Sequence, residues 1–297
     1  MAESHRFGFV TILGRPNVGK STLINQFIGK KISIISSKPQ TTRHRILGIR
    51  TSEQAQTVFI DTPGVHQNQK SYLNKIINRT ASSSLEGVDL VLFMVTADGW
   101  READETAFQL VKRDDLKVIV AINKIDRLDD KNKLLPLIER ISQSGEIEAV
   151  IPISALRRKG VKELMGYIER HLPEGLPGFP KDQVTDRSPE FMAAELVREQ
   201  LFRRLGQELP YVCAVEIESF AKEKHRLNIH AVIWVEKPGH KAIVLGKNGS
   251  SIREIGKKAR EGMIKMYNSP VYLGLFVKVR EGWSENPRVM KTLGYID

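Results

Sequence analysis

Short apolar runs alternate with longer amphipathic or polar stretches through the first part of the chain. The runs are Phe9–Leu13, Val58–Ile60, Leu90–Val95, Val118–Ile122 and Val150–Ile153. A buried parallel strand reads as a continuous apolar run, and the stretches between the runs are long enough for crossover helices. The pattern over residues 7–172 therefore predicts an α/β fold with a mostly parallel sheet and helices on both faces.

The pattern changes after a stretch that is rich in proline and glycine. Residues 173–180 read PEGLPGFP, and such a stretch continues neither a helix nor a central strand. Beyond it the periodicity predicts a helix at 189–205, strands at 212–217 and 226–236, a helix at 251–267 and a strand at 271–279. We therefore predict a first domain at 1–172, a linker at 173–188 and a smaller α+β domain at 189–297.

The composition and charge of the chain favour some partners and exclude some classes of protein. The 297 residues include 46 Lys and Arg against 35 Asp and Glu, a net charge of +11, which favours polyanionic partners such as nucleic acid or an acidic membrane surface. No apolar run approaches the roughly 20 residues that cross a bilayer. The single cysteine, Cys213, excludes an internal disulfide and a cysteine-based metal cluster. We expect a cytoplasmic protein.

A glycine-rich loop follows the first apolar run. It reads Gly14-Arg15-Pro16-Asn17-Val18-Gly19-Lys20-Ser21-Thr22. Its first eight residues fit the G-x-x-x-x-G-K-[ST] pattern between a strand and a helix. In such loops backbone N–H groups surround a phosphate, the lysine reaches the β- and γ-phosphates, and the hydroxyl binds Mg²⁺. The loop predicts a nucleotide site more strongly than the alternative, a glycine turn without a ligand.

Two later loops are candidates for recognising the base. They are Asn123-Lys124-Ile125-Asp126 and Ser154-Ala155-Leu156, each directly after an apolar run and so at the ligand-binding edge of a parallel sheet. The Asp126 carboxylate can accept from the two adjacent N–H donors of guanine, which adenine lacks. We expect Asn123 to contact the purine, Lys124 to brace the pocket, and residues 154–156 to bring a backbone N–H to the guanine oxygen.

Another segment after a strand supplies a carboxylate for the metal shell. Asp61-Thr62-Pro63-Gly64 offers this carboxylate together with a glycine N–H for the γ-phosphate. Upstream, residues 40–44 offer a threonine hydroxyl for the same metal, and we favour Thr42 over Thr41. The predicted metal ligands are Ser21, Thr42 and Asp61, and the predicted catalytic residues are Lys20, Thr42, Gly64 and Asn17.

These loops, in this order, resemble those of the translation-factor-related GTPases. The resemblance covers the whole first domain, at positions 14–21, 40–44, 61–64, 123–126 and 154–156. It implies a Mg²⁺-dependent enzyme that hydrolyses GTP to GDP and phosphate. It also implies that the segments around 31–45 and 62–75 change conformation with the γ-phosphate.

One residue departs from the best-known GTPases. Val65 follows Gly64 where many GTPases have the glutamine that orients the attacking water, so we expect slow hydrolysis by this domain alone. Asn17 resembles the asparagine with which some GTPases hold a K⁺ ion near the phosphates; here it either binds K⁺ or only shapes the loop. His66 is a weaker candidate for orienting the water.

A second glycine loop precedes the helix predicted at 251–267. Glycines at both of its ends permit close approach to a sugar-phosphate chain, and Ser251 with Glu254 forms a capping-box pattern for the helix. Residues 237–265 hold eight Lys and Arg but only two Glu. The alternative is a tight turn on a solvated basic face. The candidate RNA-binding residues are Gly246, Lys247, Asn248, Gly249, Arg253 and Lys257.

The order helix, strand, strand, G-x-x-G, helix, strand resembles the type II KH module, which implies binding of single-stranded RNA. Joined to the first domain, and including residues 293–297, it makes the chain resemble the bacterial Era family over essentially its whole length. The resemblance implies binding near the 3′ end of small-subunit ribosomal RNA, a role in maturation of the small (30S) ribosomal subunit, and some association with the inner membrane surface. We expect a monomer that does not bind DNA.

Two other functions stay open on the sequence alone. One is a passive RNA-binding chaperone in which the nucleotide is a structural ligand; RNA affinity that is indifferent to GTP or GDP would distinguish it. The other is a membrane-surface regulator whose charge faces acidic lipids. We rank the second lower because no basic amphipathic helix with an aromatic face stands out.

Overall fold

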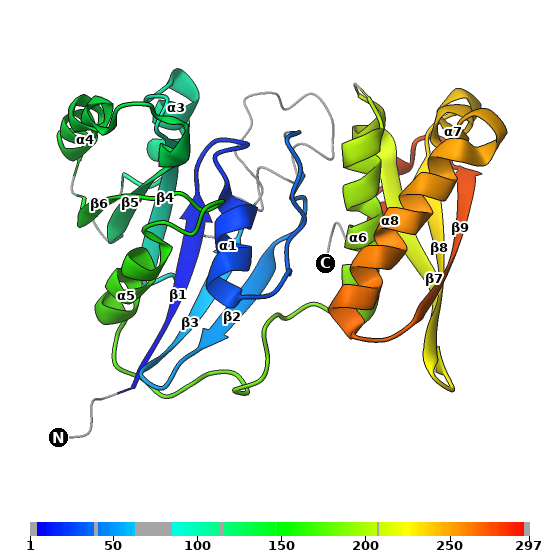
Figure 1. The fold of residues 1–297 in the computed structure, drawn as a ribbon, viewed down its shortest axis with the longest axis horizontal. Coiled ribbons are helices and arrows are strands. Elements are labelled where there is room, and N and C mark those ends of the chain that lie inside the picture. Colours follow the sequence, from blue (N-terminus) through cyan, green and yellow to red (C-terminus); the bar gives the residue numbers. More distant parts are fainter. Residues whose placement is uncertain are drawn as a thin grey trace. The chain divides into compact units, whose positions relative to one another are not determined.

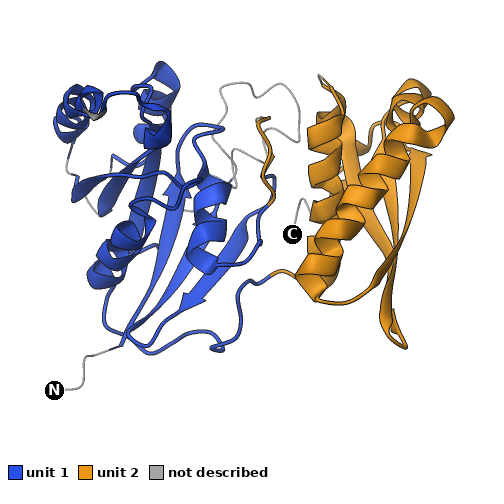
Figure 2. Cartoon of the chain, viewed as in Figure 1, with its two compact units in different colours: residues 1–33, 42–68, 77–186 blue, residues 34–41, 69–76, 187–297 orange. Residues whose placement is uncertain are grey.

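The computed structural model describes residues 5–38, 41–62, 85–112, 116–145, 147–206 and 208–293. These residues divide into two compact units, which Figure 2 distinguishes by colour. The first unit holds the described residues of 5–33, 42–62 and 85–186, and the second holds those of 34–41 and 187–293. Each unit has a hydrophobic core of its own.

Within the described residues, the first unit is built on a six-stranded sheet (Figure 1). The strands lie in the order β2-β3-β1-β4-β5-β6, and every neighbouring pair is parallel except β2 with β3. Their bounds are β1 Arg6–Leu13, β2 Ile46–Thr51, β3 Ala55–Asp61, β4 Leu90–Thr96, β5 Val118–Asn123 and β6 Ala149–Pro152. β3, β4 and β5 are buried along their whole length, which explains their continuous apolar runs. The predicted α/β fold is confirmed.

Helices lie on both faces of this sheet (Figure 1). α1 (Lys20–Ile28) and α5 (Val161–His171) contact each other and β3. α3 (Glu102–Phe108) and α4 (Leu134–Ser142) contribute to a core shared with β4 and β5. Two short turns of 3₁₀-helix, η1 (Ile125–Arg127) and η2 (Lys131–Lys133), follow β5.

Residues 173–186, which belong to the predicted linker, hydrogen-bond along the first unit. The Ile49 N–H donates to the Val184 carbonyl at 2.9 Å, and the Gln56 side chain accepts from the Gly178 N–H at 2.8 Å. The chain therefore stays with the first unit as far as Asp186.

The second unit combines a three-stranded sheet with helices, as expected for the smaller α+β domain. β8 lies in the middle, antiparallel to β7 and parallel to β9. The strands are β7 Cys213–Glu223, β8 Arg226–Val235 and β9 Val271–Val279, and the helices are α6 Pro189–Arg204, η3 Leu209–Val212, α7 Pro238–Leu245, η4 Lys247–Gly249, α8 Ser250–Tyr267, η5 Trp283–Glu285 and α9 Pro287–Thr292. α7 is a helix in a stretch for which the sequence pattern predicted neither a helix nor a strand.

The two faces of the second sheet have different surroundings. Odd-numbered residues of β8 and β9, such as Ile229, Ile233 and Val277, join the core to which α6 and α8 contribute. Since successive strand residues point to opposite faces, the even-numbered residues lie on the face away from that core.

Among the residues that the structure describes, no helix is both long enough and apolar enough to span a membrane.

Candidate functional site

The glycine-rich loop between β1 and α1, the phosphate loop (residues 14–22), contains glycines with positive backbone φ angles. Gly14 and Gly19 have φ of 143° and 112°. A Cβ at Gly14 would lie 2.3 Å from the Met94 carbonyl oxygen, and one at Gly19 would lie 2.3 Å from Asn123 Nδ2. Both positions therefore require glycine for conformation and for space.

Lys20 lies buried beneath this loop. Its Nζ donates to the carbonyl oxygens of Gly14 and Arg15 at 2.8 and 3.1 Å. Burial lowers the pKa of Lys20 to about 8, although the Asp61 carboxylate opposes the shift. A cation held under a ring of backbone groups at a helix N-terminus is suited to binding a phosphate chain.

The three predicted metal ligands meet at one point. Ser21 Oγ lies 3.0 Å from Thr42 Oγ1 and donates to Asp61 Oδ2 at 3.2 Å. Ser33, which no sequence motif indicated, donates to the same Asp61 oxygen at 2.5 Å. Thr41 turns away, because its Oγ1 donates to the Lys38 carbonyl at 2.7 Å.

Asp61 has the properties of a ligand for a hard cation. It is fully buried, and burial raises the pKa of its carboxyl group, against hydrogen bonds from Ser33 and Ser21. Within the described part of the chain, its Oδ1 atom is buried without a hydrogen-bond partner. A buried carboxylate with an uncompensated oxygen, beside the hydroxyls of Ser21, Ser33 and Thr42, fits the all-oxygen coordination of Mg²⁺.

The two base-recognition loops are joined by side-chain hydrogen bonds. Ser154 Oγ donates to Asp126 Oδ1. Asn123 Nδ2 donates to the Val18 carbonyl at 2.7 Å, and its Oδ1 accepts from the Ala155 N–H at 2.9 Å. Asn123 thus ties the phosphate loop to the loop after β6. Its expected contact with the purine stays a prediction.

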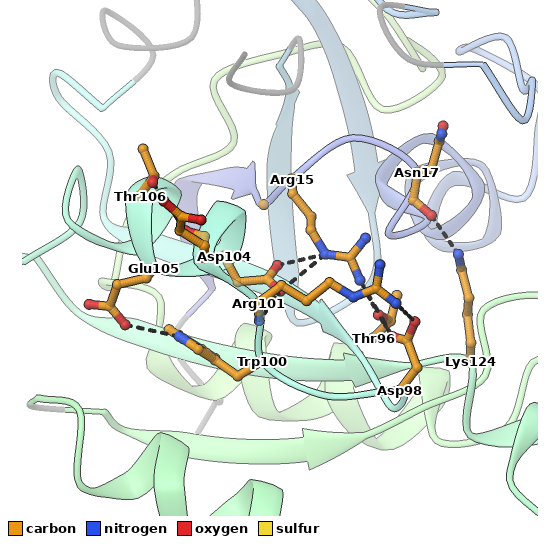
Figure 3. Close-up of polar contacts among 12 residues, drawn as sticks. Arg15, Asn17, Thr96, Asp98, Trp100, Arg101, Asp104, Glu105, Thr106 and Lys124 are labelled. Atoms are coloured by element: carbon orange, nitrogen blue, oxygen red, sulfur yellow. Dashed lines mark hydrogen bonds and ion pairs between the residues drawn. The ribbon is translucent and has the colours of Figure 1, made fainter. Parts of the chain in front are cut away.

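Lys124 also contacts the phosphate loop. Its Nζ donates to the Asn17 carbonyl at 2.5 Å (Figure 3). The contact ties Lys124 to the phosphate loop, and its role in bracing the base pocket stays a prediction. Leu156, at the end of the last loop, is 70% exposed.

Arg15 anchors the phosphate loop to α3 through a polar cluster (Figure 3). Its Nε lies 3.0 Å from the carboxylate of Asp104, which is fully buried. Its guanidinium also donates to Thr96 and reaches Asp98 at 3.4 Å. Asp104 in turn accepts from the Arg101 N–H at 3.0 Å. Burial raises the pKa of Asp104, which the neighbouring N–H and guanidinium oppose.

Several predicted positions lie outside the described residues: Gln40, Pro63, Gly64, Val65 and His66. Thr62, just before that stretch, donates from Oγ1 to the Ile12 carbonyl at 2.9 Å. Its hydroxyl therefore secures the end of β3 against β1.

The second glycine loop joins α7 to α8. Gly246 has φ 72°, and a Cβ there would lie 2.7 Å from Ser251 Cβ. Lys247 and Asn248 are exposed at the tip, and Asn248 adopts the left-handed conformation at φ 52°. The loop thus presents two polar side chains and a close backbone to solvent.

The start of α8 differs from the prediction. Gly249 is the N-cap, and no side chain caps the helix, so the capping box expected of Ser251 and Glu254 does not form. The Ser251 hydroxyl instead accepts from Arg204 Nε at 3.3 Å.

Two parts of the chain match family models. Residues 9–124 match the family described as 50S ribosome-binding GTPase, and residues 208–284 match the KH domain. The first match includes the phosphate loop and the start of the Asn123-Lys124-Ile125-Asp126 loop. The second includes the whole α7–loop–α8 element.

Relatives that match along their whole length decide the family. GTPase Era of Xanthomonas oryzae pv. oryzae is 50% identical over 294 residues, which cover 99% of this chain and 98% of that protein. This chain belongs to the Era family of GTPases. GTPase Era of Stenotrophomonas maltophilia is 48% identical over 291 residues, covering 98% of each chain. The resemblance to the Era family found in the sequence is confirmed.

Two solved Era structures resemble the chain closely. A variant of Aquifex aeolicus Era bound to GDP and AlF₄⁻ has a TM-score of 0.94 and 40% identity, covering 98% of this chain and 100% of that one. Era in complex with MgGDPNP and nucleotides 1506–1542 of 16S ribosomal RNA also has a TM-score of 0.94 and 40% identity, covering 99% and 100%.

Proposed function

We propose that this Era-family GTPase binds the 3′ region of 16S ribosomal RNA through its second unit and assists maturation of the small ribosomal subunit. Its affinity for the RNA would depend on whether GTP or GDP is bound. The observation that carries the proposal is the similarity, at a TM-score of 0.94, to an Era structure that holds MgGDPNP and 16S rRNA together. The exposed Gly246–Gly249 loop and the basic residues of α8 are the groups of this chain suited to that RNA.

The first unit supplies the groups for GTP binding and hydrolysis. Lys20 would exchange its carbonyl contacts for the β- and γ-phosphates. Ser21, Thr42 and Asp61 would hold Mg²⁺, which would neutralise negative charge on the phosphates. The Asp126 carboxylate would accept from the guanine N–H groups.

Position 65 is Val65 and not the glutamine that orients the attacking water in many GTPases. Another group must therefore orient the water or stabilise the developing charge. We keep the proposal that Asn17, whose side chain is exposed at the loop, helps to hold a K⁺ ion that stabilises the developing charge. Hydrolysis should then be faster in K⁺ than in Na⁺ at equal ionic strength. Equal rates in the two salts would remove this role.

The domain limits and the location of the protein are also proposals. We retain a GTPase domain at 1–172 and a KH domain at 189–297, with 173–188 between them. We propose that the protein acts in the cytoplasm, where a precursor of the 30S subunit would be available to it. Association with the inner membrane surface rests on the family resemblance, and vesicle co-sedimentation would test it.

The deciding experiment measures RNA affinity in two nucleotide states. A short strand matching the 3′ end of 16S rRNA is titrated at fixed salt against the protein loaded with GDPNP or with GDP. Tighter binding in the GDPNP form supports a GTP-dependent RNA-binding protein. Equal affinities would favour the passive chaperone instead, and absent binding in both forms would contradict the RNA proposal.

The matched variant is the exposed pair Lys247→Asp and Asn248→Asp. Aspartates at the tip repel phosphate without entering the core, so RNA binding should be lost while the rate of GTP hydrolysis without RNA stays unchanged. A carboxylate at Gly246 would be a poorer test, because its Cβ would lie 2.7 Å from Ser251 Cβ and would distort the loop.

A further inference from the structure

The open face of the second unit's sheet has a group of exposed rings. Tyr272 and Phe276 on β9 are 48% and 51% exposed. The His230 ring, on β8, stacks against Phe276 with ring centroids 6.4 Å apart and a 17° interplanar angle. It also meets Tyr272 at 5.7 Å.

Gly274 makes this arrangement possible. It pairs with His230 across the two strands, and a Cβ at Gly274 would lie 2.7 Å from His230 Nδ1. Without a side chain at 274, the His230 ring can lie between Tyr272 and Phe276. All four residues are even-numbered, so they lie on the face away from the core beneath α6 and α8.

The charges around the rings differ between the two margins of the sheet. Toward β9, the Arg226 guanidinium lies 5.6 Å from the Tyr272 ring centroid, and Lys278 and Arg280 each lie 5.7 Å from the Trp234 ring. β7 carries the acidic residues: Glu218 pairs with Lys278 at 2.6 Å, Glu216 accepts from Trp234 Nε1 at 2.7 Å, and Glu223 accepts from Asn228. Because Glu218 pairs with Lys278, the positive charge toward β9 is carried mainly by Arg226 and Arg280, and a polyanion is disfavoured along β7.

A basic path joins the rings to the Gly246–Gly249 loop. Arg253, Lys257 and Arg260 are exposed and spaced by four and three residues on α8, so they share one face of the helix. Arg260 and Arg226 line, with Tyr272, a recess of about 390 Å³ at the start of β9. The positive charge thus continues from the loop along α8 to the edge of the ring group.

We propose that this face, centred on Tyr272, Phe276 and His230, is a second RNA-binding surface that takes unpaired bases. Exposed aromatic rings on a sheet face are suited to stacking bases, as in other sheet-based RNA modules. Phosphates would follow Arg226 and Arg260 from the glycine loop. The RNA strand held by the glycine loop would continue onto this surface, beyond the roughly four nucleotides that a KH loop clamps. This inference rests on RNA binding by the second unit.

The test compares two strand lengths. Affinity is measured for an unstructured RNA of four nucleotides and for one of about twelve, with the wild type and with the double variant Tyr272→Ala and Phe276→Ala. The longer strand should lose roughly tenfold or more in affinity in this variant, while the short strand binds as before. Leu176→Ala, at a position that is 84% exposed in the first unit, is the matched control and should change neither.

Two further experiments distinguish RNA binding by the ring group from RNA binding by the glycine loop alone. Arg226→Ala should weaken binding of the long strand and reduce its salt dependence, with the rings intact. A long strand with 4-thiouridine beyond the clamped nucleotides should crosslink to the peptide that contains Tyr272 and Phe276. GTP hydrolysis and thermal unfolding of each variant establish that the fold is kept.

Three outcomes would overturn the inference. Unchanged affinity for the long strand in the double variant, with loss in the Lys247→Asp and Asn248→Asp variant, would leave RNA on the loop alone. Unchanged RNA affinity with lost binding to 30S subunits would assign the face to a protein partner. RNA binding that neither variant weakens would contradict the proposed function as well.

Discussion

Two adjacent threonines show how the metal site depends on single hydroxyl groups. Thr42 lies beside Ser21, whereas Thr41 bonds to the Lys38 carbonyl. The sequence pattern offers little to separate them: the partner of Thr41 lies three residues away, whereas Ser21, beside Thr42, lies 21 residues away in the chain. The P-loop pattern could be read from spacing, but Ser33 and Asp104 could not, since each acts on a residue that is distant in sequence.

Thr42→Ala should raise the Mg²⁺ concentration needed for GTP hydrolysis by about tenfold or more, because one oxygen of the metal shell is lost. The rate is measured across a Mg²⁺ titration. Thr41→Ala is the control, and it should keep the Mg²⁺ dependence of the wild type. Equal effects of the two substitutions would contradict the assignment of Thr42.

Asp126→Asn should weaken GTP binding by roughly tenfold or more, because the new amide offers one acceptor where the carboxylate offered two. Xanthosine triphosphate, which presents an acceptor in place of one guanine donor, should bind the variant better than the wild type. Nucleotide affinities are measured by calorimetry. An unchanged GTP affinity would remove the argument for guanine.

At the scale of elements, apolar periodicity predicted most of the strands and the helices after 188. It missed α7, because Pro238–Leu245 has too few polar residues to show a helical face. The capping box at Ser251 also failed, since Gly249 in the left-handed conformation already begins α8. The proline and glycine of residues 173–180 correctly indicated an irregular segment. Its attachment to Gln56 could not be read locally, because the partners lie more than a hundred residues apart.

α6 offers a direct test of a helix cap. Ser188 Oγ accepts from the Phe191 N–H at 3.2 Å, and Pro189 occupies the first turn. Ser188→Ala should lower the free energy of unfolding of the second unit by about 1 kcal/mol, as measured by urea denaturation. Ser250→Ala is the control, because Ser250 is exposed and does not cap α8. A loss as large in the control would contradict the capping role.

At the scale of the whole molecule, the net charge of +11 is a poor guide to where RNA binds, because basic residues occur in both units. The exposed basic side chains of α8 indicate the RNA-binding surface more specifically than the net charge does. Each lysine or arginine that neutralises a phosphate contributes to the salt dependence of binding, whereas a distant one does not.

Lys257→Ala should therefore reduce the slope of log affinity against log salt concentration by about 0.7 for a single strand. Lys222→Ala removes the same charge from an exposed position on β7 and should leave the slope unchanged. Affinities are measured at four or more salt concentrations. Similar slopes for both variants would indicate that net charge, and not the α8 face, governs binding.

The segment that connects the two units has a consequence for association between chains. β2 is an edge strand of the six-stranded sheet. On its outer side the Ile49 N–H donates to the Val184 carbonyl, and the Leu47 N–H donates to Asp186 Oδ1, both at 2.9 Å. Occupied N–H groups cannot template strand pairing with another molecule. Cleavage or glycine–serine replacement at 181–186 would therefore show first as self-association, before GTP binding is affected.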